Sequence, residues 1–174
     1  MYLHVAKIPL CFVMTTISIR PIELQDNPFV ESLIKSVFDE LDLPKTGTAY
    51  EDASLKTMYQ NYNCENSIYF VLETNGKIIG GAGIASLENE KMEVCELQKM
   101  YFLPEARGLG FGNQLMQLCL EKAKMFGFES CYLETLPQMK DAQKLYVKSG
   151  FNYLEKPFGL TGHTSCPIWM LKKL

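Results

Sequence analysis

Three alternating glycines, Gly108, Gly110 and Gly112, follow Arg107 in the run FLPEARGLGFG, and the residues after them have a helical pattern. The first N–H groups of a helix have no partner within the helix and lie at the positive end of its dipole, so they bind anions. Glycines allow a phosphate to approach such a backbone closely, and Arg107 adds a charged donor. The segment is therefore suited to hold a diphosphate.

Two common phosphate-binding loops differ from this segment. A P-loop has a lysine and a hydroxyl residue after its last glycine, whereas Asn113 follows Gly112 here, which excludes a P-loop. A dinucleotide fingerprint has the spacing GxGxxG in the first βαβ unit, whereas this spacing is GxGxG and follows four predicted strands, so that interpretation is weak. The remaining alternative is a turn whose glycines only begin a helix.

The segments that must position these residues alternate between strand and helix patterns. Asn75-Gly76 separates two β-rich runs within residues 67–87 and predicts a hairpin. We expect further strands at 16–22, 92–103, 130–135, 151–155 and 167–171, and helices at 28–40, 50–62, 108–126 and 139–149. This order predicts an α+β fold in which helices cover the faces of one mixed sheet.

Composition narrows the possible functions. The net charge of −3 provides no positive field for nucleic acid, so we expect no nucleic-acid partner. The six cysteines are scattered singly and there are two histidines, so we expect no metal site, and reduced thiols in a cytoplasmic protein. The apolar start, interrupted by Lys7 and Pro9, is too short to cross a membrane. We expect residues 1–14 to be a short extension of a single domain at 15–174.

Two motifs resemble those of a known family. The run FLPEARGLGFG at 102–112 is similar to the acetyl-CoA motif of the GNAT superfamily of N-acetyltransferases, and ETLPQMKDAQKLYVKSGF at 134–151 resembles its second signature, A-x-x-L-Y-x-K-x-G-F. The element order also fits, over roughly residues 15–174. The resemblance implies a GNAT-like acyl-CoA N-acyltransferase fold in α/β/α layers. In it, a mostly antiparallel sheet contains two central parallel strands that splay apart.

The resemblance also implies a cosubstrate, acetyl-CoA, and where this chain holds it. The backbone of Met100 to Phe102 would bond the pantetheine arm, and the amides of the glycine loop would hold the diphosphate. The implied cofactor-binding residues are Met100, Tyr101, Phe102, Arg107, Gly108, Leu109, Gly110, Phe111, Gly112 and Asn113.

Glu96 is the candidate general base. It stands six residues before Phe102, the spacing at which several family members carry a catalytic glutamate. An amine acceptor is protonated at neutral pH, so a carboxylate has a proton to remove. Strict alternation along a strand predicts that Glu96 shares a sheet face with Gln98, Met100 and Phe102. The alternative is a solvated glutamate paired with a surface lysine.

Tyr146 is the candidate general acid. It matches the tyrosine of the second signature, which in the family donates a proton to the departing CoA thiolate. The alternative is a packing role, because Ala142, Leu145 and Tyr146 form an apolar helical face. A backbone N–H near Phe102 would polarise the thioester carbonyl.

Glu134 and His163 are candidates for holding the acceptor, since the family's acceptor site lies beside the corresponding strand end and loop. We therefore expect an enzyme that transfers acetyl directly from acetyl-CoA to a primary amine of a small or amino-acid-like molecule. The alternatives are a protein lysine or N-terminal acetyltransferase and a non-catalytic acyl-CoA-binding module. The resemblance is compatible with a homodimer and gives no reason to expect a membrane partner.

Overall fold

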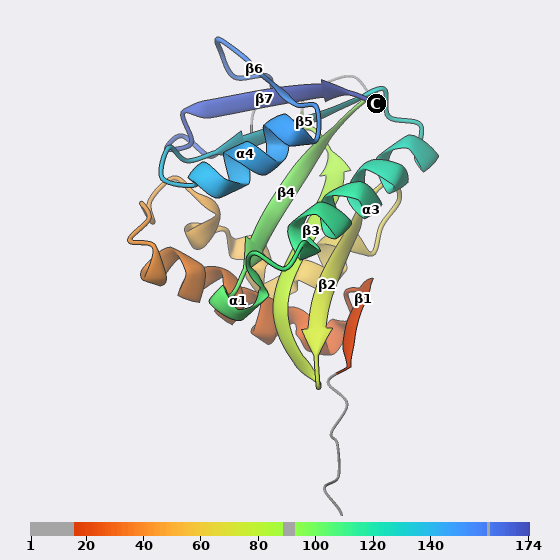
Figure 1. The fold of residues 1–174 in the computed structure, drawn as a ribbon. Helices are drawn as coiled ribbons and strands as arrows, with labels where there is room; N and C mark the ends of the chain where they lie inside the picture. The colour runs from red at the N-terminus through yellow and green to blue at the C-terminus, as the bar shows by residue number, and fades with distance from the viewer. Residues whose placement is uncertain (1–15, 89–92, 160) are drawn as a thin grey trace, which may run out of the picture.

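A computed structural model describes residues 16–88, 93–159 and 161–174, and in this part of the chain a seven-stranded sheet forms the centre (Figure 1). The strands lie in the order β1-β2-β3-β4-β5-β7-β6; β4 and β5 pair in parallel and the other neighbouring pairs are antiparallel. Their bounds are β1 Ile17–Pro21, β2 Ile68–Thr74, β3 Lys77–Ser86, β4 Val94–Phe102, β5 Ser130–Thr135, β6 Asn152–Tyr153 and β7 Ile168–Lys173.

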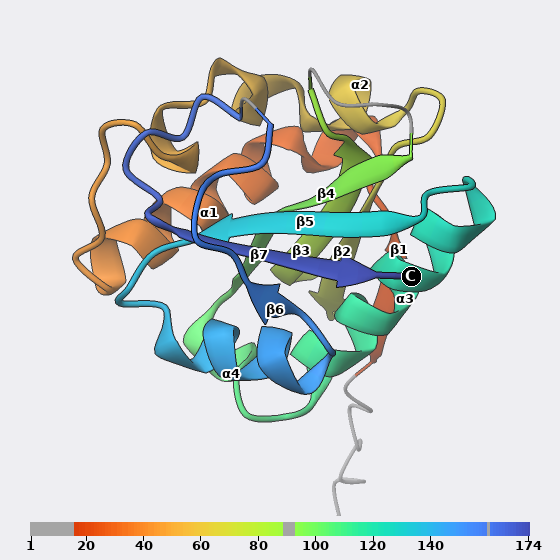
Figure 2. The same cartoon turned by 90° about the horizontal axis from the view of Figure 1, so that it is seen from above.

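Helices cover both faces of the sheet. Helices α1 (Asn27–Glu40) and α2 (Met58–Tyr62) lie on one face, and α3 (Phe111–Met125) and α4 (Lys140–Lys148) lie on the other (Figure 2). Each face has its own buried apolar cluster. One contains Leu33, Ile34 and Phe38 of α1, and the other contains Leu115, Met116 and Cys119 of α3. The predicted α+β class with mixed layers is confirmed.

Glycine conformations fix two of the predicted turns. Asn75 and Gly76 both have positive φ, 49° and 80°, as a type I′ hairpin turn requires, which confirms the hairpin. In the glycine loop, Gly108 (φ 74°) and Gly110 (φ 86°) are left-handed, so α3 begins at Phe111 and not at the predicted residue 108.

The helix predicted over 50–62 is wrong in its first part. Residues Ala49–Glu51 and Ala53–Thr57 form two 3-10 turns, and the α-helix covers only Met58–Tyr62. The break falls at Asp52, whose backbone is extended (φ −59°, ψ 117°) and whose carboxylate bonds Lys99 and His163. Long-range ionic contacts therefore decide the conformation where the apolar spacing suggests a continuous helix.

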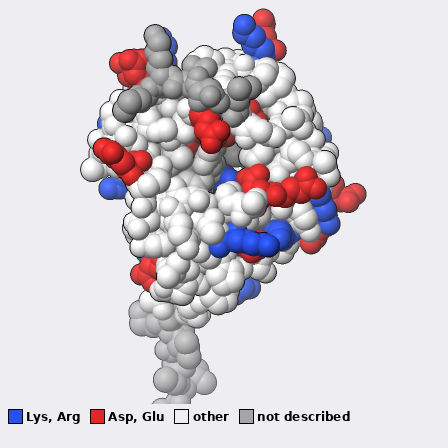
Figure 3. Space-filling view, turned by 180° about the vertical axis from the view of Figure 1, so that it is seen from behind, with Lys and Arg blue, Asp and Glu red and all other residues white. Residues whose placement is uncertain are grey.

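Some predictions concern the ends of the chain and its surface. The proposed extension at 1–14 lies outside the described residues, as does the start of the third β-rich run at residue 92. On the face in Figure 3, acidic and basic side chains are interspersed over a largely uncharged surface. Within the described residues, no helix combines the length and apolarity needed to cross a membrane.

Candidate functional site

The gap between β4 and β5 is the central feature of the site. The two strands pair in parallel only from Val94 opposite Ser130 to Glu96 opposite Tyr132. Beyond that point β4 continues to Phe102 and β5 to Thr135 without pairing with each other, although each still pairs with its other neighbour. The two edges that face the gap expose backbone N–H and C=O groups. The two parallel strands thus splay apart, as the resemblance implied.

A groove of about 380 Å³ runs from this gap to the glycine loop. The end of α1, the end of β4 and the start of α4 form its other walls. Of the residues predicted to bind the cofactor, six line the groove: Met100, Tyr101, Phe102, Arg107, Gly108 and Gly112. The other four, Leu109, Gly110, Phe111 and Asn113, belong to the same loop and the first turn of α3 but are not among the lining residues.

The glycine loop leaves space above its backbone. A Cβ added at Gly108 or Gly110 would meet no heavy atom within 4 Å, so an external group can approach here. At Gly112 an added Cβ would lie 3.1 Å from Leu145 Cδ2, so this glycine also allows α3 and α4 to pack closely. The N–H groups that begin α3 follow directly, with no side chain capping them. This loop has the properties of an anion-binding helix terminus.

Arg107 lines the groove, and each of its three nitrogens already donates one hydrogen bond within the protein. Its Nε donates to the Phe102 carbonyl at 2.9 Å, and its Nη1 and Nη2 donate to the Glu40 carboxylate at 2.7 and 2.8 Å. The side chain therefore ties the loop to the end of α1 and to β4. The guanidinium orders the glycine loop, and the backbone amides of that loop are left as the main donors for an anion.

A β-bulge interrupts β4 beside the gap. Gly81 pairs with Tyr101 and Gly83 pairs with Gln98, so β4 has one more residue than β3 between these pairs. Lys99 has a positive φ of 52°, which is unusual for a residue with a side chain. The Tyr69 hydroxyl donates to the Lys99 carbonyl at 2.9 Å, and Lys99 Nζ lies 2.7 Å from Asp52. These contacts hold the bulge.

The bulge corrects the predicted alternation along β4. Glu96 and Gln98 share a face, since Gln98 Nε2 donates to Glu96, but Met100 and Phe102 pack in the apolar cluster of the opposite face. Tyr101 instead packs with Phe38 on the α1 side. The extra residue shifts the alternation by one, so Glu96 faces the α1 side together with Tyr101.

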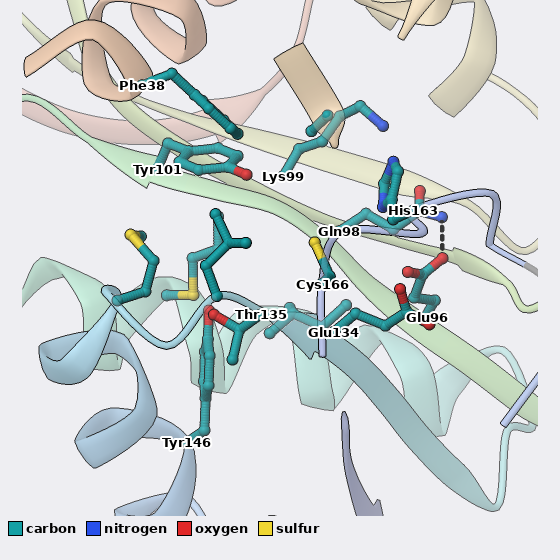
Figure 4. Close-up of a pocket in the computed structure, with 15 residues that line it drawn as sticks. Phe38, Glu96, Gln98, Lys99, Tyr101, Glu134, Thr135, Tyr146, His163 and Cys166 are labelled. Carbon is teal, nitrogen blue, oxygen red and sulfur yellow. Dashed lines mark hydrogen bonds between the residues drawn. The ribbon is translucent and has the colours of Figure 1, made fainter. Parts of the chain in front are cut away.

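Glu96 lies in the wall of a second, smaller cavity of about 50 Å³ (Figure 4). This cavity adjoins the groove, because Met100, Tyr101 and Met139 line both. The Glu96 side chain is 6% exposed, and burial raises its pKa to about 7, although the hydrogen bond from Gln98 acts in the opposite direction. A carboxyl group with this pKa can accept a proton from a neighbouring group near neutral pH.

Two further residues fix the orientation of this carboxylate. The Gln98 amide donates to Glu96 Oε2 at 2.6 Å, and the Tyr62 hydroxyl donates to Gln98 Oε1 at 2.6 Å. Because an ionised carboxylate only accepts, the Gln98 amide nitrogen faces Glu96 and the amide oxygen is left to accept from the Tyr62 hydroxyl. Tyr62, from α2, thereby positions a carboxylate on β4.

Tyr146 has features of both predicted roles. It is buried among the apolar residues between α4 and the sheet, and burial raises its pKa well above the ordinary value. It also lines the small cavity, and its hydroxyl is at the end of the ring that points toward that cavity (Figure 4). The phenol therefore stays protonated at neutral pH and can donate a hydrogen bond there.

His163 and Glu134 lie on the remaining walls of the small cavity. His163 Nε2 lies 3.1 Å from Asp52, whose carboxylate also bonds Lys99. Glu134 accepts hydrogen bonds from the Tyr132 and Thr161 hydroxyls, both at 2.7 Å. The structure thus brings Glu96, Tyr146, Glu134 and His163 around one cavity.

Comparisons with known proteins agree with this geometry. Residues 34–151 match the model of the acetyltransferase (GNAT) family. The chain is 40% identical to the uncharacterized N-acetyltransferase YjgM of Escherichia coli K12, over 89% of this chain and 93% of that protein.

The chain belongs to the GNAT family of acetyltransferases. Two solved structures share its fold. A GNAT-family acetyltransferase from Staphylococcus aureus Mu50 superimposes with a TM-score of 0.81 at 20% identity, over 91% of this chain and 99% of the other. YncA of Salmonella typhimurium, solved with its cofactor acetyl-CoA, superimposes with a TM-score of 0.73 at 17% identity, over 91% of this chain and 94% of YncA. The predicted enzyme class is confirmed at the level of the family.

Four residues in or beside this candidate site were not identified from the sequence: Asp52, Tyr62, Gln98 and Lys99. Gln98 was noted for its place on the strand but not for its contact with Glu96. A signal for Lys99 existed in the glycine-rich run of β3, because glycines at 80, 81 and 83 can accompany a bulge. Asp52 and Tyr62 stand in a helix-like pattern, and no local feature distinguishes them.

Proposed function

We propose that this GNAT protein transfers an acetyl group directly from acetyl-CoA to a primary amine of a small or amino-acid-like molecule, in a ternary complex. The observation that carries the proposal is the buried carboxylate of Glu96 in a cavity that adjoins the groove. Two reactants in adjoining spaces can react without a covalent enzyme intermediate. YncA of Salmonella typhimurium binds acetyl-CoA, and a related acetyltransferase from Thermoplasma acidophilum was solved with coenzyme A.

The groove and the glycine loop fit the proposed cosubstrate. The backbone at Met100–Phe102 borders the gap, and the open space above Gly108 and Gly110 adjoins the first amides of α3. These groups would hold the pantetheine amides and the diphosphate. When bound, the cosubstrate supplies an activated acetyl group as a thioester, and free thiol is the second product.

Glu96 would remove the proton that the acceptor amine must lose. A free primary amine of pKa about 10 is mostly protonated at pH 7. With its own pKa near 7, Glu96 is partly ionised at neutral pH and can accept this proton directly or through water. The C–N bond would form first, which places negative charge on the carbonyl oxygen, and the C–S bond would break as the carbonyl re-forms.

Tyr146 would supply the proton that the departing thiolate takes up. Its phenol is protonated and faces the cavity near the junction with the groove. A hydrogen bond to the sulfur makes the thiolate a better leaving group. The backbone N–H groups of the splayed part of β4 would stabilise the negative charge on the carbonyl oxygen.

A screen for thiol release tests this proposal. Acetyl-CoA is mixed with polyamines, amino acids, aminoglycosides or basic peptides, and the free thiol is measured. We expect turnover with a small amine, and losses of about 10²- to 10³-fold in Glu96→Gln and Tyr146→Phe with unchanged CoA affinity. Turnover with basic peptides alone would favour a protein acetyltransferase. CoA binding without any thiol release would favour a non-catalytic acyl-CoA-binding module.

A further inference from the structure

Charges of opposite sign lie at different sides of the small cavity. Glu96 of β4 and Glu134 of β5 border the splayed strand ends, where Glu96 is opposite Tyr132 in the register. Lys99 and His163 approach from the bulge and from the loop before β7 (Figure 4). A ligand in this cavity therefore meets carboxylates on one side and basic groups on the other.

The basic side has more positive than negative charge. Asp52 is shared by two basic groups, since its Oδ2 lies 2.7 Å from Lys99 Nζ and its Oδ1 lies 3.1 Å from His163 Nε2. These partners keep the pKa of Asp52 at about 2 despite its burial, and the hydrogen bond to Asp52 raises the pKa of His163. With His163 protonated, the three groups carry one net positive charge.

This surplus charge has no protein counter-ion at bonding distance. Among the described residues, no ion pair joins Glu96 or Glu134 to Lys99 or His163. Glu96 instead accepts from Gln98, and Glu134 accepts from two hydroxyls. Lys99 and His163 share the single carboxylate of Asp52, so their charge is only partly compensated at short range, and an anionic group of a ligand would be stabilised at this position. His163 Nε2 faces Asp52, which leaves Nδ1 as the donor on the ring for such a group.

The size of the cavity restricts the ligand. Its volume is about 50 Å³, and one water needs roughly 10–15 Å³ on this scale, so the space corresponds to about four waters. Described residues of the loop before β7 border it, and two bonds hold them in place: Thr161 donates to Glu134 at 2.7 Å and Ser165 N donates to the Gly47 carbonyl at 3.1 Å. An acceptor the size of glycine, alanine or serine fits this space better than a polyamine or a peptide.

We propose that the acceptor is a small zwitterionic amino acid. Its carboxylate binds on the Lys99–Asp52–His163 side of the cavity, and its amino group lies at the Glu96–Glu134 side. The proposal rests on the proposed function and adds to it a subsite that selects acceptors by their negative charge.

Matched acceptors test this subsite. Glycine, alanine and serine are compared with glycinamide, alaninamide and serinamide in the thiol-release assay. Each pair differs by one negative charge, and the amides have the less basic amino group, which favours them if the carboxylate is not recognised. We expect kcat/KM to be at least tenfold higher for the acids, because a hydrogen bond to a charged group is stronger than one to a neutral group.

His163→Gln is the variant that separates recognition from structure. Glutamine keeps a hydrogen-bonding group near Asp52 but removes the positive charge. We expect the acid-to-amide ratio to fall at least tenfold, because the acid loses its charged partner and the amide does not. Lys56→Gln, which removes an exposed charge from the neighbouring 3-10 turn, is the control and should keep the wild-type ratio.

Calorimetric titration of each acceptor into the CoA complex gives a readout that is independent of turnover. Tighter binding of serine than of serinamide, lost in His163→Gln, supports the subsite even if catalysis is slow. Amides that bind or react as well as the acids would overturn the subsite and leave the proposed function standing. Acids that bind selectively without thiol release would overturn the proposed function and leave the subsite standing.

Discussion

At the residue scale, the environment of Glu96 matters more than its residue type. Burial raises its pKa, while Gln98 donates to one oxygen and prevents a larger rise. The burial comes from the elements packed around β4, and the hydrogen bond comes from Gln98 two residues along the same strand. The result is a carboxyl group that changes protonation near neutral pH, where a base for an amine is most useful.

We predict a pH dependence of activity that depends on Glu96. With a pKa of about 7, the ionised base is lost as pH falls below 7, so kcat/KM should fall about tenfold per pH unit there. Glu96→Gln should lose the break near pH 7 and rise about tenfold per pH unit across pH 5 to 9 in thiol-release assays, because only the neutral amine then reacts. Glu105→Gln, at an exposed carboxylate, is the control and should keep the break. Persistence of the break near pH 7 in Glu96→Gln would assign it to another group.

Gln98 and Tyr62 should shift the same limb through the hydrogen bonds that orient Glu96. Gln98→Leu removes the donor to Glu96 and should raise the pKa of that carboxyl, which moves the acidic limb to higher pH. Tyr62→Phe should move it in the same direction by less, because Tyr62 acts through Gln98. Tyr59→Phe, on the same helix, should leave the profile unchanged. Loss of rate at every pH without a shift would indicate a structural role only.

At the element scale, the bulge in β4 and the glycines of β3 together decide which side chains of β4 face each side of the sheet. The bulge leaves Glu96 and Tyr101 on the α1 side of the sheet and Met100 and Phe102 on the opposite side. On the neighbouring strand, Gly80 leaves room for the Phe102 ring, since an added Cβ would lie 2.3 Å from Phe102 Cδ1. Close contact between a glycine and a ring thus sets one wall of the groove.

We predict that Gly80→Ala weakens both the fold and the binding of CoA. The added methyl group must displace the Phe102 ring, which lines the groove, and overpacking of this kind destabilises by about 1–3 kcal/mol. The control is Gly127→Ala, where φ is +87° and no atom lies within 4 Å, so the effect is backbone strain alone. Unfolding curves and CoA titrations should show destabilisation in both variants, but weaker CoA binding only in Gly80→Ala. Equal CoA affinity in the two would contradict the proposed groove.

At the scale of the whole molecule, the buried carboxyl makes stability depend on pH. The pKa of Glu96 is raised from 4.5 to about 7 in the folded protein, so the folded state holds this proton more tightly than the unfolded state. Its contribution to stability is full below pH 4.5 and is lost as pH rises to about 7. Asp52 has the opposite sign, because its pKa is lowered to about 2, and its contribution is lost as pH falls from 3.8 toward 2.

We therefore predict that Glu96→Gln is more stable relative to the wild type at pH 8 than at pH 5. The rise in the pKa of Glu96 from 4.5 to about 7 corresponds to about 3 kcal/mol of unfolding free energy, which is an upper bound because the buried site can relax. Denaturant unfolding at the two pH values measures the difference. Tyr146→Phe introduces no such change in charge and should show no comparable pH dependence. If the stability difference between Glu96→Gln and the wild type were the same at pH 5 and pH 8, it would contradict the raised pKa of Glu96.

Local patterns were enough to predict much of the fold. The hairpin at Asn75-Gly76 and the helix after the glycine loop depend on residues close in sequence, whose conformations are limited by φ and by unpaired N–H groups. The helix predicted through Asp52 failed because its contact with His163 joins residues 111 positions apart. The face of Met100 was also mispredicted, because a bulge depends on the neighbouring strand.

By itself, the sequence determined the order of the elements, the glycine loop at the start of a helix, and the two motifs that identify the family. These features depend on spacing within single segments. The tertiary structure alone decided which residues surround the small cavity, how Tyr62 reaches Glu96 through Gln98, and that Asp52 lies between Lys99 and His163. Burial and charge pairing depend on contacts between segments far apart in the chain, and those contacts set the pKa of Glu96 and the charge of the cavity.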